Sequence, residues 1–286
     1  MTTNKTEIKQ SGPWGKIHSG ISLFFLFMFA FLFLFPLYWM LKAAFQPSFM
    51  AIQMPPEFLP VKLTLSNFAK LFGKTPAFRW LLNSVIVAGT STLLTVMFSS
   101  LAGYAFAKKN FVGKNALFWM LMTAMMVPKQ VTLVPLYVMM NQYHLYNTYA
   151  GQYLPMVAWP FGLFLMRQYM QTLPEECLQS ARIDGAGEWT LFWKIVMPLS
   201  KPAIATTAIL TFVNTWNDYM WQLVIVKDTV MATLPVGISK FAYSEMSVDY
   251  GLLMAGAAFG ALPMILLFAF FQKYFVKGIT MGAVKG

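Results

Sequence analysis

Residues 214–222 carry amide, carboxyl and indole side chains within a largely apolar stretch. On a helix, the polar side chains among them fall within an arc of about 140°, so they share one face. Amides and carboxylates can exchange hydrogen bonds with a hydroxylated solute, and indole rings offer it apolar faces. We expect this face to line a solute pathway; hydrogen bonding between neighbouring helices is the alternative. The candidate pathway residues are Asn214, Trp216, Asn217, Asp218, Trp221 and Gln222.

Two ionisable side chains, Asp218 and Lys129, lie within long apolar stretches. An ionised carboxylate near mid-membrane costs at least about 2.5 to 3.5 kcal/mol, so Asp218 must face protein or a water-filled cavity. Lys129 follows Pro128, and proline frees a backbone carbonyl that can line a cavity. We expect Lys129 either to join the pathway or to extend toward lipid headgroups.

The other reactive side chains do not form a catalytic or metal-binding group. Cys177 is the single cysteine, and His18 and His144 lack clustered acidic partners. The chain has neither a glycine-rich phosphate loop nor a nucleophile elbow. We therefore expect a protein that is not an enzyme, with no metal site and no cofactor bound by this chain.

A charged stretch between two apolar ones predicts a pair of helices. Thr172 and Glu175 have the spacing of a capping box, so a first helix should run from there to Asp184. Gly185 begins a break, after which aromatic residues recur at helical spacing until Pro198 ends the second helix. A connection this elaborate, with a run of aromatic residues, predicts a docking element.

The composition indicates that lipid surrounds most of these elements. Of the 286 residues, 58% are apolar and 11% are charged, whereas about 25% are charged in soluble proteins. The mean hydropathy is +0.57. A net charge of +11 is no sign of nucleic-acid binding here, because excess Lys and Arg in a membrane protein marks cytoplasmic loops.

Apolar stretches separated by charged ones predict six membrane-spanning helices, since the hydrocarbon core is about 30 Å thick. The expected fold class is all-α, with residues 1–286 forming one polytopic membrane domain. The expected spans are 17–41, 80–107, 115–140, 151–170, 202–226 and 250–272, and the third should be interrupted at Pro128 and Lys129.

The distribution of Lys and Arg predicts the orientation. Thirteen of them lie on the side that holds both termini and eight on the other, so both termini should be cytoplasmic. Three glycines in the last residues predict a flexible tail. The expected parts are a cytoplasmic amino end at 1–16, an external loop at 42–79, a cytoplasmic loop at 172–198 and a cytoplasmic tail at 278–286.

The loop at 172–198 resembles the permease subunits of ATP-binding-cassette (ABC) importers. Their signature is Glu-Ala-Ala, three residues, Gly, nine residues, Ile, one residue, Leu-Pro. Here the spacing is intact, and residues 181–186 match the family, while Gln179, Ser180 and Met197 depart from it. The residues that the resemblance assigns to ATPase coupling are Glu175, Gln179, Ser180, Ala181, Asp184, Gly185, Ala186, Ile195 and Pro198.

Two further segments, 214–218 and 278–286, look like the carbohydrate-importing branch, in particular the second permease partner of maltose-type systems. The resemblance implies a type I ABC importer permease fold with a cytoplasmic coupling helix pair and an oligosaccharide or related carbohydrate as substrate. Glycerol phosphates are an alternative substrate. An ion-coupled secondary transporter that uses the Asp218 carboxylate is a different mechanism, although it would not require the helix pair.

The same resemblance implies the partners. They are a second permease subunit in a heterodimer, two cytoplasmic ATP-binding subunits that hold ATP and Mg, and an external solute-binding protein. The expected location is the cytoplasmic (inner) membrane of a bacterium or archaeon. In such systems the carboxyl-terminal tail reaches between the ATPase subunits.

Overall fold

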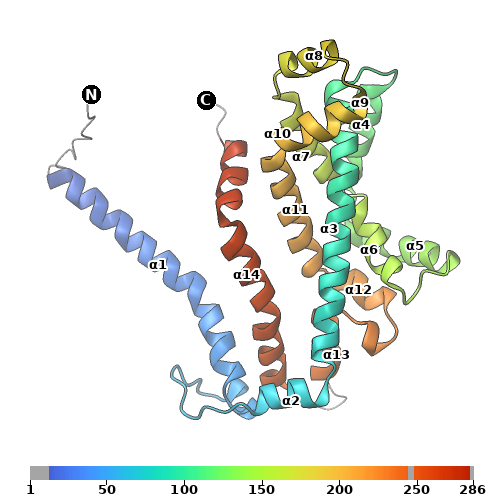
Figure 1. The fold of residues 1–286 in the computed structure, drawn as a ribbon. Helices are drawn as coiled ribbons and strands as arrows, with labels where there is room; N and C mark the ends of the chain where they lie inside the picture. Colours follow the sequence, from blue (N-terminus) through green and yellow to red (C-terminus); the bar gives the residue numbers. More distant parts are fainter. Residues whose placement is uncertain (1–12, 244–247, 284–286) are drawn as a thin grey trace.

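The structure is a computed structural model that describes residues 13–243 and 248–283. The regular elements in these ranges are helices, and their β pairing is limited to an isolated antiparallel bridge between Tyr243 and Val248. The expected all-α class is confirmed. Long helices form the body of the molecule, and short helices lie at both of its ends (Figure 1).

Within residues 13–243 and 248–283, three helices are long and apolar enough to cross a bilayer without interruption. They are α1 (Pro13–Ala44), α3 (Ala77–Lys108) and α14 (Tyr250–Ala283). They contain the predicted first, second and sixth spans, which are confirmed as continuous helices. α14 also includes residues 278–283 of the tail, so this part is helical and not irregular as expected. Residues 1–12 of the amino end and 284–286 of the tail lie outside the described residues.

The predicted interruption of the third span at Pro128 and Lys129 is confirmed, since this span is not one helix. α4 (Lys114–Thr123) and η2 (Ala124–Met126) lead to α5 (Lys129–Gln142), and the two parts meet at a bend of 102°. Pro128 causes the bend, because it has no amide hydrogen and its backbone is extended directly before α5. α5 therefore extends sideways from the other helices (Figure 1).

The predicted fourth and fifth spans are also interrupted. α6 (Tyr149–Val157) and α7 (Pro160–Gln171) replace one helix, since Pro160 begins a new one. α11 (Lys201–Trp216) and α12 (Met220–Ile225) replace another. With each bent helix pair counted as one crossing, the described residues contain up to five spans by length and composition. The count of six therefore stays a prediction.

Short helices occupy the two ends of the bundle (Figure 1). The end at which α14 begins contains η1 (Ser48–Ile52), α2 (Ser66–Lys74) and α13 (Leu234–Ala242). The opposite end contains α8 (Glu175–Ile183), α9 (Glu188–Thr190), the π-helical segment η3 (Leu191–Val196) and α10 (Met197–Leu199). We call α8 to α10 the helix pair. The predicted loops at 42–79 and 172–198 thus lie at opposite ends.

α3 is the centre of the packing and lies against both α7 and α11. A Cβ atom on Gly103 would lie 2.7 Å from the Cβ of Met166, and one on Gly162 would lie 2.7 Å from the Ser99 hydroxyl oxygen. Small residues at these positions let the helices approach closely, as in other membrane proteins. α3 and α7 therefore form a tightly packed unit.

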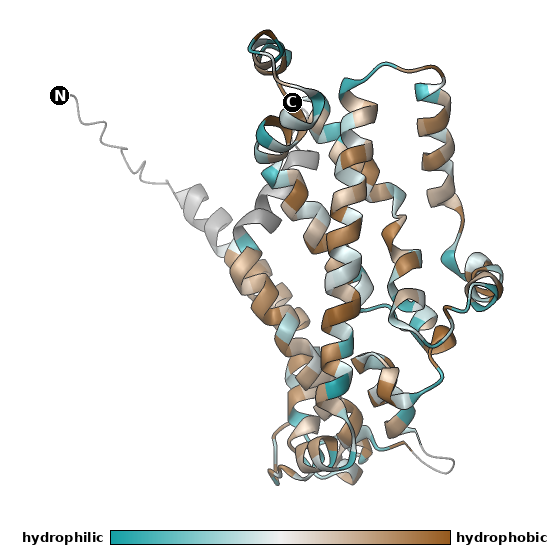
Figure 2. Ribbon diagram, turned by 45° about the vertical axis from the view of Figure 1, so that its right-hand side comes forward, coloured by the Kyte–Doolittle hydropathy of each residue, from teal (hydrophilic) through white to brown (hydrophobic). Residues whose placement is uncertain are grey.

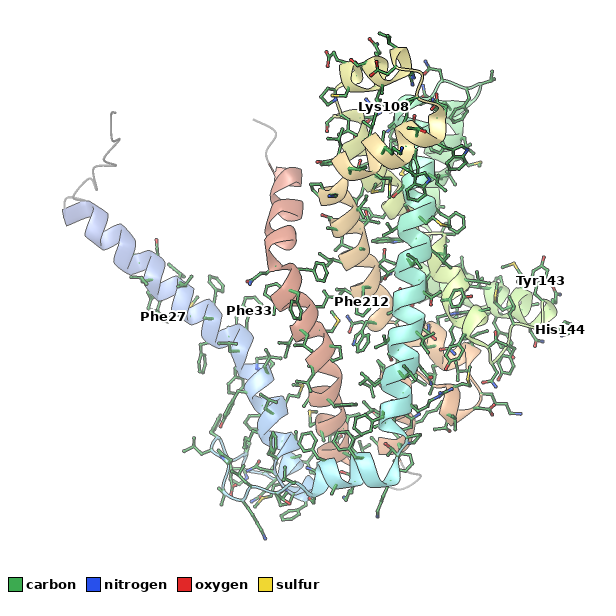
Figure 3. All side chains as sticks on the ribbon, in the orientation of Figure 1. Phe27, Phe33, Lys108, Tyr143, His144 and Phe212 are labelled. Carbon is green, nitrogen blue, oxygen red and sulfur yellow. The ribbon has the colours of Figure 1, made fainter. Side chains whose placement is uncertain are left out.

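α1 leans away from the other helices along most of its length (Figure 1). Its surface is strongly apolar (Figure 2), and no residue of its most apolar 18-residue window is buried within this chain. Phe27 and Phe33 are 68% and 72% exposed (Figure 3). An apolar surface of this extent is suited to lipid or to another membrane subunit.

Candidate functional site

α8 ends in a glycine cap built by the signature residues. The Ala186 amide donates to the Ala181 carbonyl at 2.9 Å, and the Gly185 amide donates to the Arg182 carbonyl at 3.0 Å, which is a Schellman motif. Gly185 has a φ of +81°. A Cβ atom there would meet no atom of this chain within 4 Å, so the left-handed backbone, and not a lack of space, favours glycine.

The second helix of the pair begins at Glu188 and continues through η3 into α10. The prediction that this helix ends at Pro198 is confirmed to within one residue, because the helix ends at Leu199. The predicted capping box, however, is wrong. Thr172 follows α7, and its hydroxyl donates to the Tyr169 carbonyl at 2.8 Å; Pro174, without a side-chain cap, precedes α8.

A buried apolar cluster joins the helix pair to the membrane helices. Leu178 of α8 and Phe192 of η3 pack against Tyr104 of α3, and the rings of Tyr104 and Phe192 lie 5.5 Å apart. Burial of one such apolar side chain contributes about 1.5 to 3 kcal/mol. The helix pair is therefore attached firmly to α3 and α7. The other buried members of the cluster are Met166, Met170, Leu191, Val196 and Ala203.

The other side of the helix pair is exposed. Ile183 is 86% and Trp189 is 69% exposed, although both are large and apolar. Grouped apolar side chains in water indicate a surface that another protein covers. Among the predicted coupling residues, Ala181, Ala186 and Ile195 are half-buried, and the exposed ones are Glu175, Gln179, Ser180, Asp184, Gly185 and Pro198.

Glu188 is a site residue that the sequence analysis missed. The Tyr104 hydroxyl donates to Oε2 of Glu188 at 2.8 Å, and the Lys109 ammonium pairs with the same oxygen. Hydrogen bonds from Lys109 and Tyr104 hold the pKa of Glu188 below its ordinary value of 4.5. Two features of the sequence pointed to this contact. Glu188 is an acidic residue at the start of the second helix, and the adjacent lysines Lys108 and Lys109 follow the predicted span 80–107.

A pocket of about 460 Å³ surrounds the break between α11 and α12. Asn214, Asn217 and Asp218 all line it. The expected continuous helical face is wrong, because the Asp218 carboxylate accepts the Trp221 amide at 3.1 Å and so caps α12 as a separate helix. The three polar side chains nevertheless meet in one cavity.

Lys129 reaches the same region from α5. It is the exposed first residue of that helix and lines a second pocket, of about 190 Å³, with Asp218 and Trp221. Gln130 and Thr132 add further polar groups to its wall. The two charges identified in apolar stretches of the sequence thus face one cavity.

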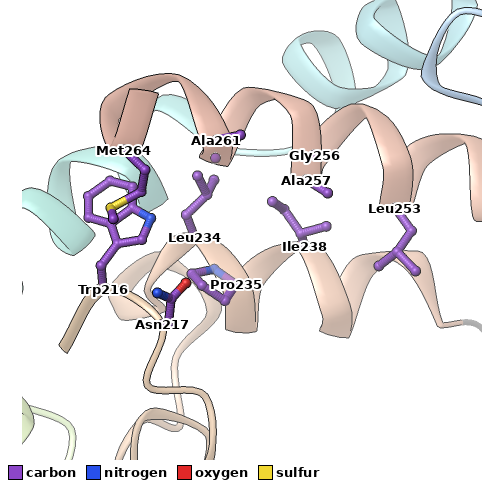
Figure 4. Close-up of a pocket in the computed structure, with 11 residues that line it drawn as sticks. Trp216, Asn217, Leu234, Pro235, Ile238, Leu253, Gly256, Ala257, Ala261 and Met264 are labelled. Carbon is purple, nitrogen blue, oxygen red and sulfur yellow. The ribbon is translucent and has the colours of Figure 1, made fainter. Parts of the chain in front are cut away.

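A third pocket, of about 500 Å³, lies between the end of α11 and helices α13 and α14 (Figure 4). Trp216 and Asn217 lie at one end of it, and Leu234 and Ile238 of α13 form part of its wall. Trp216 is only 4% exposed, and its ring stacks on Phe212 at 5.5 Å. Asn217 therefore brings an amide to a mostly apolar cavity.

Trp221 and Gln222 are buried between α12 and α6. The Trp221 indole donates to the Gly151 carbonyl at 3.0 Å, and the Gln222 amide donates to the Gln152 carbonyl at 3.2 Å. Hydrogen bonding between neighbouring helices was the alternative role for the polar face of residues 214–222, and Trp221 and Gln222 have that role. The sequence analysis did not identify Gln152, whose side chain is fully buried in α6.

Comparison with known proteins identifies relatives along nearly the whole chain. Residues 95–281 match the family described as binding-protein-dependent transport system inner membrane component. The arabinooligosaccharides transport system permease protein AraQ of Bacillus subtilis (strain 168) is 36% identical, over 98% of this chain and 100% of its own. The trehalose/maltose transport system permease protein MalG of Thermococcus litoralis is 34% identical, over 88% of this chain and 91% of its own.

A solved structure has the same fold. It is the crystal structure of a bacterial ABC transporter involved in the import of the acidic polysaccharide alginate. One of its chains matches 93% of this chain and 99% of its own with a TM-score of 0.81, at 21% sequence identity. The family match includes both the helix pair and the break after Trp216. The chain therefore belongs to the inner membrane components of binding-protein-dependent transport systems, and it is an ABC transport permease and not an enzyme.

Proposed function

We propose that this chain is one permease subunit of an ATP-driven importer for an oligosaccharide or a related carbohydrate. The names of AraQ and MalG, both relatives over most of this chain, support a sugar substrate. A glycerol-3-phosphate transport permease, UgpE of Yersinia pestis, is 32% identical over 86% of this chain, which makes glycerol phosphates the alternative substrate to test.

The proposed assembly contains a second permease subunit as heterodimer partner, two cytoplasmic ATP-binding subunits and an external solute-binding protein. ATP and Mg bind to the ATP-binding subunits. The assembly lies in the cytoplasmic (inner) membrane of a bacterium or archaeon, with both termini cytoplasmic. In support, the carboxyl end of α14 points toward the end of the bundle that carries the helix pair (Figure 1). The exposed face of α1 is suited to lipid or to the second permease.

The exposed face of the helix pair is the observation that carries this proposal. Ile183 and Trp189 are exposed on an element whose other face is packed firmly against α3 and α7. An ATP-binding subunit that covers this face can therefore move the membrane helices when it changes shape. An ion-coupled carrier has no need for such a surface.

The solute pathway of the proposed importer passes the break between α11 and α12. Asn214, Asn217 and Asp218 offer hydrogen-bonding groups to a hydroxylated solute there, and Lys129 adds an ammonium group. Trp216 borders the adjoining apolar cavity. This chain would supply half of the pathway, and the second permease the other half.

The test is purification of the complex through an affinity tag on this chain, followed by reconstitution in lipid vesicles with the binding protein. Arabinotriose, maltotriose and glycerol 3-phosphate serve as probes of uptake. We expect ATP-binding subunits to copurify in stoichiometric amounts and ATP to drive uptake of a neutral oligosaccharide. Uptake driven by an ion gradient without ATP would contradict the proposal, and uptake of glycerol 3-phosphate alone would overturn the sugar assignment.

A further inference from the structure

Two adjacent lysines at the end of α3 each hold the first residue of a different helix of the pair. The Lys108 ammonium lies 3.2 Å from Oε2 of Glu175, which begins α8. The Lys109 ammonium pairs with Oε2 of Glu188, which begins α9. Helix dipoles favour this arrangement, since anions are stabilised at helix N-termini and cations at C-termini. Figure 3 shows Lys108 beside the helix pair.

Arg182 connects the two acidic residues across the turn at Gly185. Its guanidinium nitrogens lie 3.6 Å from Oε1 of Glu175 and 3.9 Å from Oε1 of Glu188. Charges of opposite sign therefore alternate from Lys108 through both carboxylates to Lys109. A network of this kind can contribute where isolated surface pairs contribute little.

The two attachments to α3 differ in their access to water. The Lys108 side chain is 7% exposed and also donates to the Leu173 carbonyl at 2.7 Å, so its ammonium is held firmly at the start of α8. The Lys109 and Glu188 side chains are 32% and 55% exposed. Water can replace each partner in this second pair, so it can break without leaving a buried charge.

We propose that Lys109 and Glu188, linked to α8 through Arg182, are positioning residues that transmit ATPase-driven displacement of the helix pair into α3. The inference rests on the proposed coupling function of the pair. The apolar cluster holds the pair through contacts without directional preference, whereas charge-assisted hydrogen bonds fix an orientation. Because α3 packs along α7 and α11, a displacement at its end reaches the helix that borders the pathway.

The test compares Lys109→Gln and Glu188→Gln in the complete complex, reconstituted with its ATP-binding subunits and binding protein. The measured quantity is the ratio of sugar taken up to ATP hydrolysed. We expect this ratio to fall at least about fivefold, with unchanged melting temperature and subunit stoichiometry. Lys109→Arg should keep the wild-type ratio because it keeps the charge. Lys74→Gln is the matched control, since Lys74 is an exposed lysine at the end of α2, away from the helix pair, with no ion pair among the described residues.

An unchanged ratio in both variants would overturn the inference. A fall in the ratio that is accompanied by lost thermal stability or lost ATP-binding subunits would also overturn it, because the network would then serve folding or assembly. A wild-type complex without ATP-dependent uptake would instead refute the proposed function itself, and this control is measured first.

Discussion

The amide of Ala186 donates to the carbonyl of Ala181 at 2.9 Å, across the left-handed Gly185. This bond explains the spacing within the signature, because a Schellman motif places the bonded residues five positions apart with glycine before the second. Both alanine side chains pack against the apolar cluster under the helix pair. This part of the signature therefore encodes a helix end that sets where the second helix begins.

The first prediction is that Gly185→Val uncouples transport. A β-branched residue at a φ of +81° is strained by about 1 to 2 kcal/mol or more, so the turn should change its shape. We expect normal membrane insertion, weakened association with the ATP-binding subunits and lost uptake. Uptake in vesicles and the yield of copurified subunits measure these effects.

Gly187→Val is the control for this change. Gly187 lies in the same turn with a φ of −72°, and a Cβ atom there would meet nothing within 4 Å. It should retain association and uptake. A fully active Gly185→Val complex would remove the central role of the turn.

The second prediction is that Asn217→Leu reduces uptake and leaves assembly and basal ATP hydrolysis nearly intact. The Asn217 side chain is exposed to two pockets, and within the described part of the chain its amide donates only to the Val213 carbonyl of its own helix, at 2.9 Å. The loss of a polar contact to the solute costs on the order of 1 to 3 kcal/mol. Uptake per assembled complex measures the effect of this loss.

Asn83→Leu should have the opposite effect. The fully buried Asn83 donates to the Val230 and Ala232 carbonyls, each at 2.8 Å, so its loss removes both bonds and leaves the buried Ala232 carbonyl without this donor. We expect a lower melting temperature and near-normal uptake per assembled complex. If Asn217→Leu shows this pattern instead, Asn217 stabilises the bundle and does not contact solute.

The third prediction concerns Asp249, which joins η1 and α2 to the start of α14. It accepts the Ser48 hydroxyl at 2.6 Å and pairs with the Lys70 ammonium at 2.9 Å. Burial raises the pKa of Asp249, but hydrogen bonds from Ser48, the Leu252 amide and Lys70 outweigh burial, and the pKa lies below 3.8.

A lowered pKa in the folded state means that the unfolded state binds the proton more tightly. The stability that Asp249 contributes is therefore fully present above pH 3.8 and is lost as the pH falls below 3.8, through the lower native pKa. Asp249→Asn should lower the melting temperature at about pH 7, and the difference from wild type should shrink at about pH 3. Thermal melts in detergent test this, and a difference independent of pH would contradict it.

The fourth prediction is that Gly103→Ala destabilises the contact between α3 and α7. The added Cβ would lie 2.7 Å from the Met166 Cβ and 3.0 Å from the Arg167 amide nitrogen, and such atoms cannot move away easily. Overpacking of this kind costs about 1 to 3 kcal/mol. Gly89→Ala in the same helix meets nothing within 4 Å and should not destabilise. Equal melting temperatures for the two variants would contradict the close packing.

Apolar length by itself predicted α1, α3 and α14, because a bilayer requires about 20 consecutive apolar residues and allows few alternatives to a helix. The break at Gly185 could also be predicted, since glycine is the residue that enters the left-handed region at little cost. The exposure of Trp189 and Trp193 agrees with the docking element expected from the run of aromatic residues, whereas Phe192 of the same run is buried. These features depend on neighbours in the chain, and so they are visible in the sequence.

The tertiary structure alone decided where the fourth and fifth predicted spans break and which charges meet. Hydropathy treats 202–226 as one apolar stretch, yet the Asp218 carboxylate caps α12 and divides it. Lys129 and Asp218 come to one cavity only because α5 bends away at Pro128. Lys109 meets Glu188 because α3 and the helix pair share an apolar cluster. Contacts between residues far apart in the chain result from packing, which no local pattern specifies.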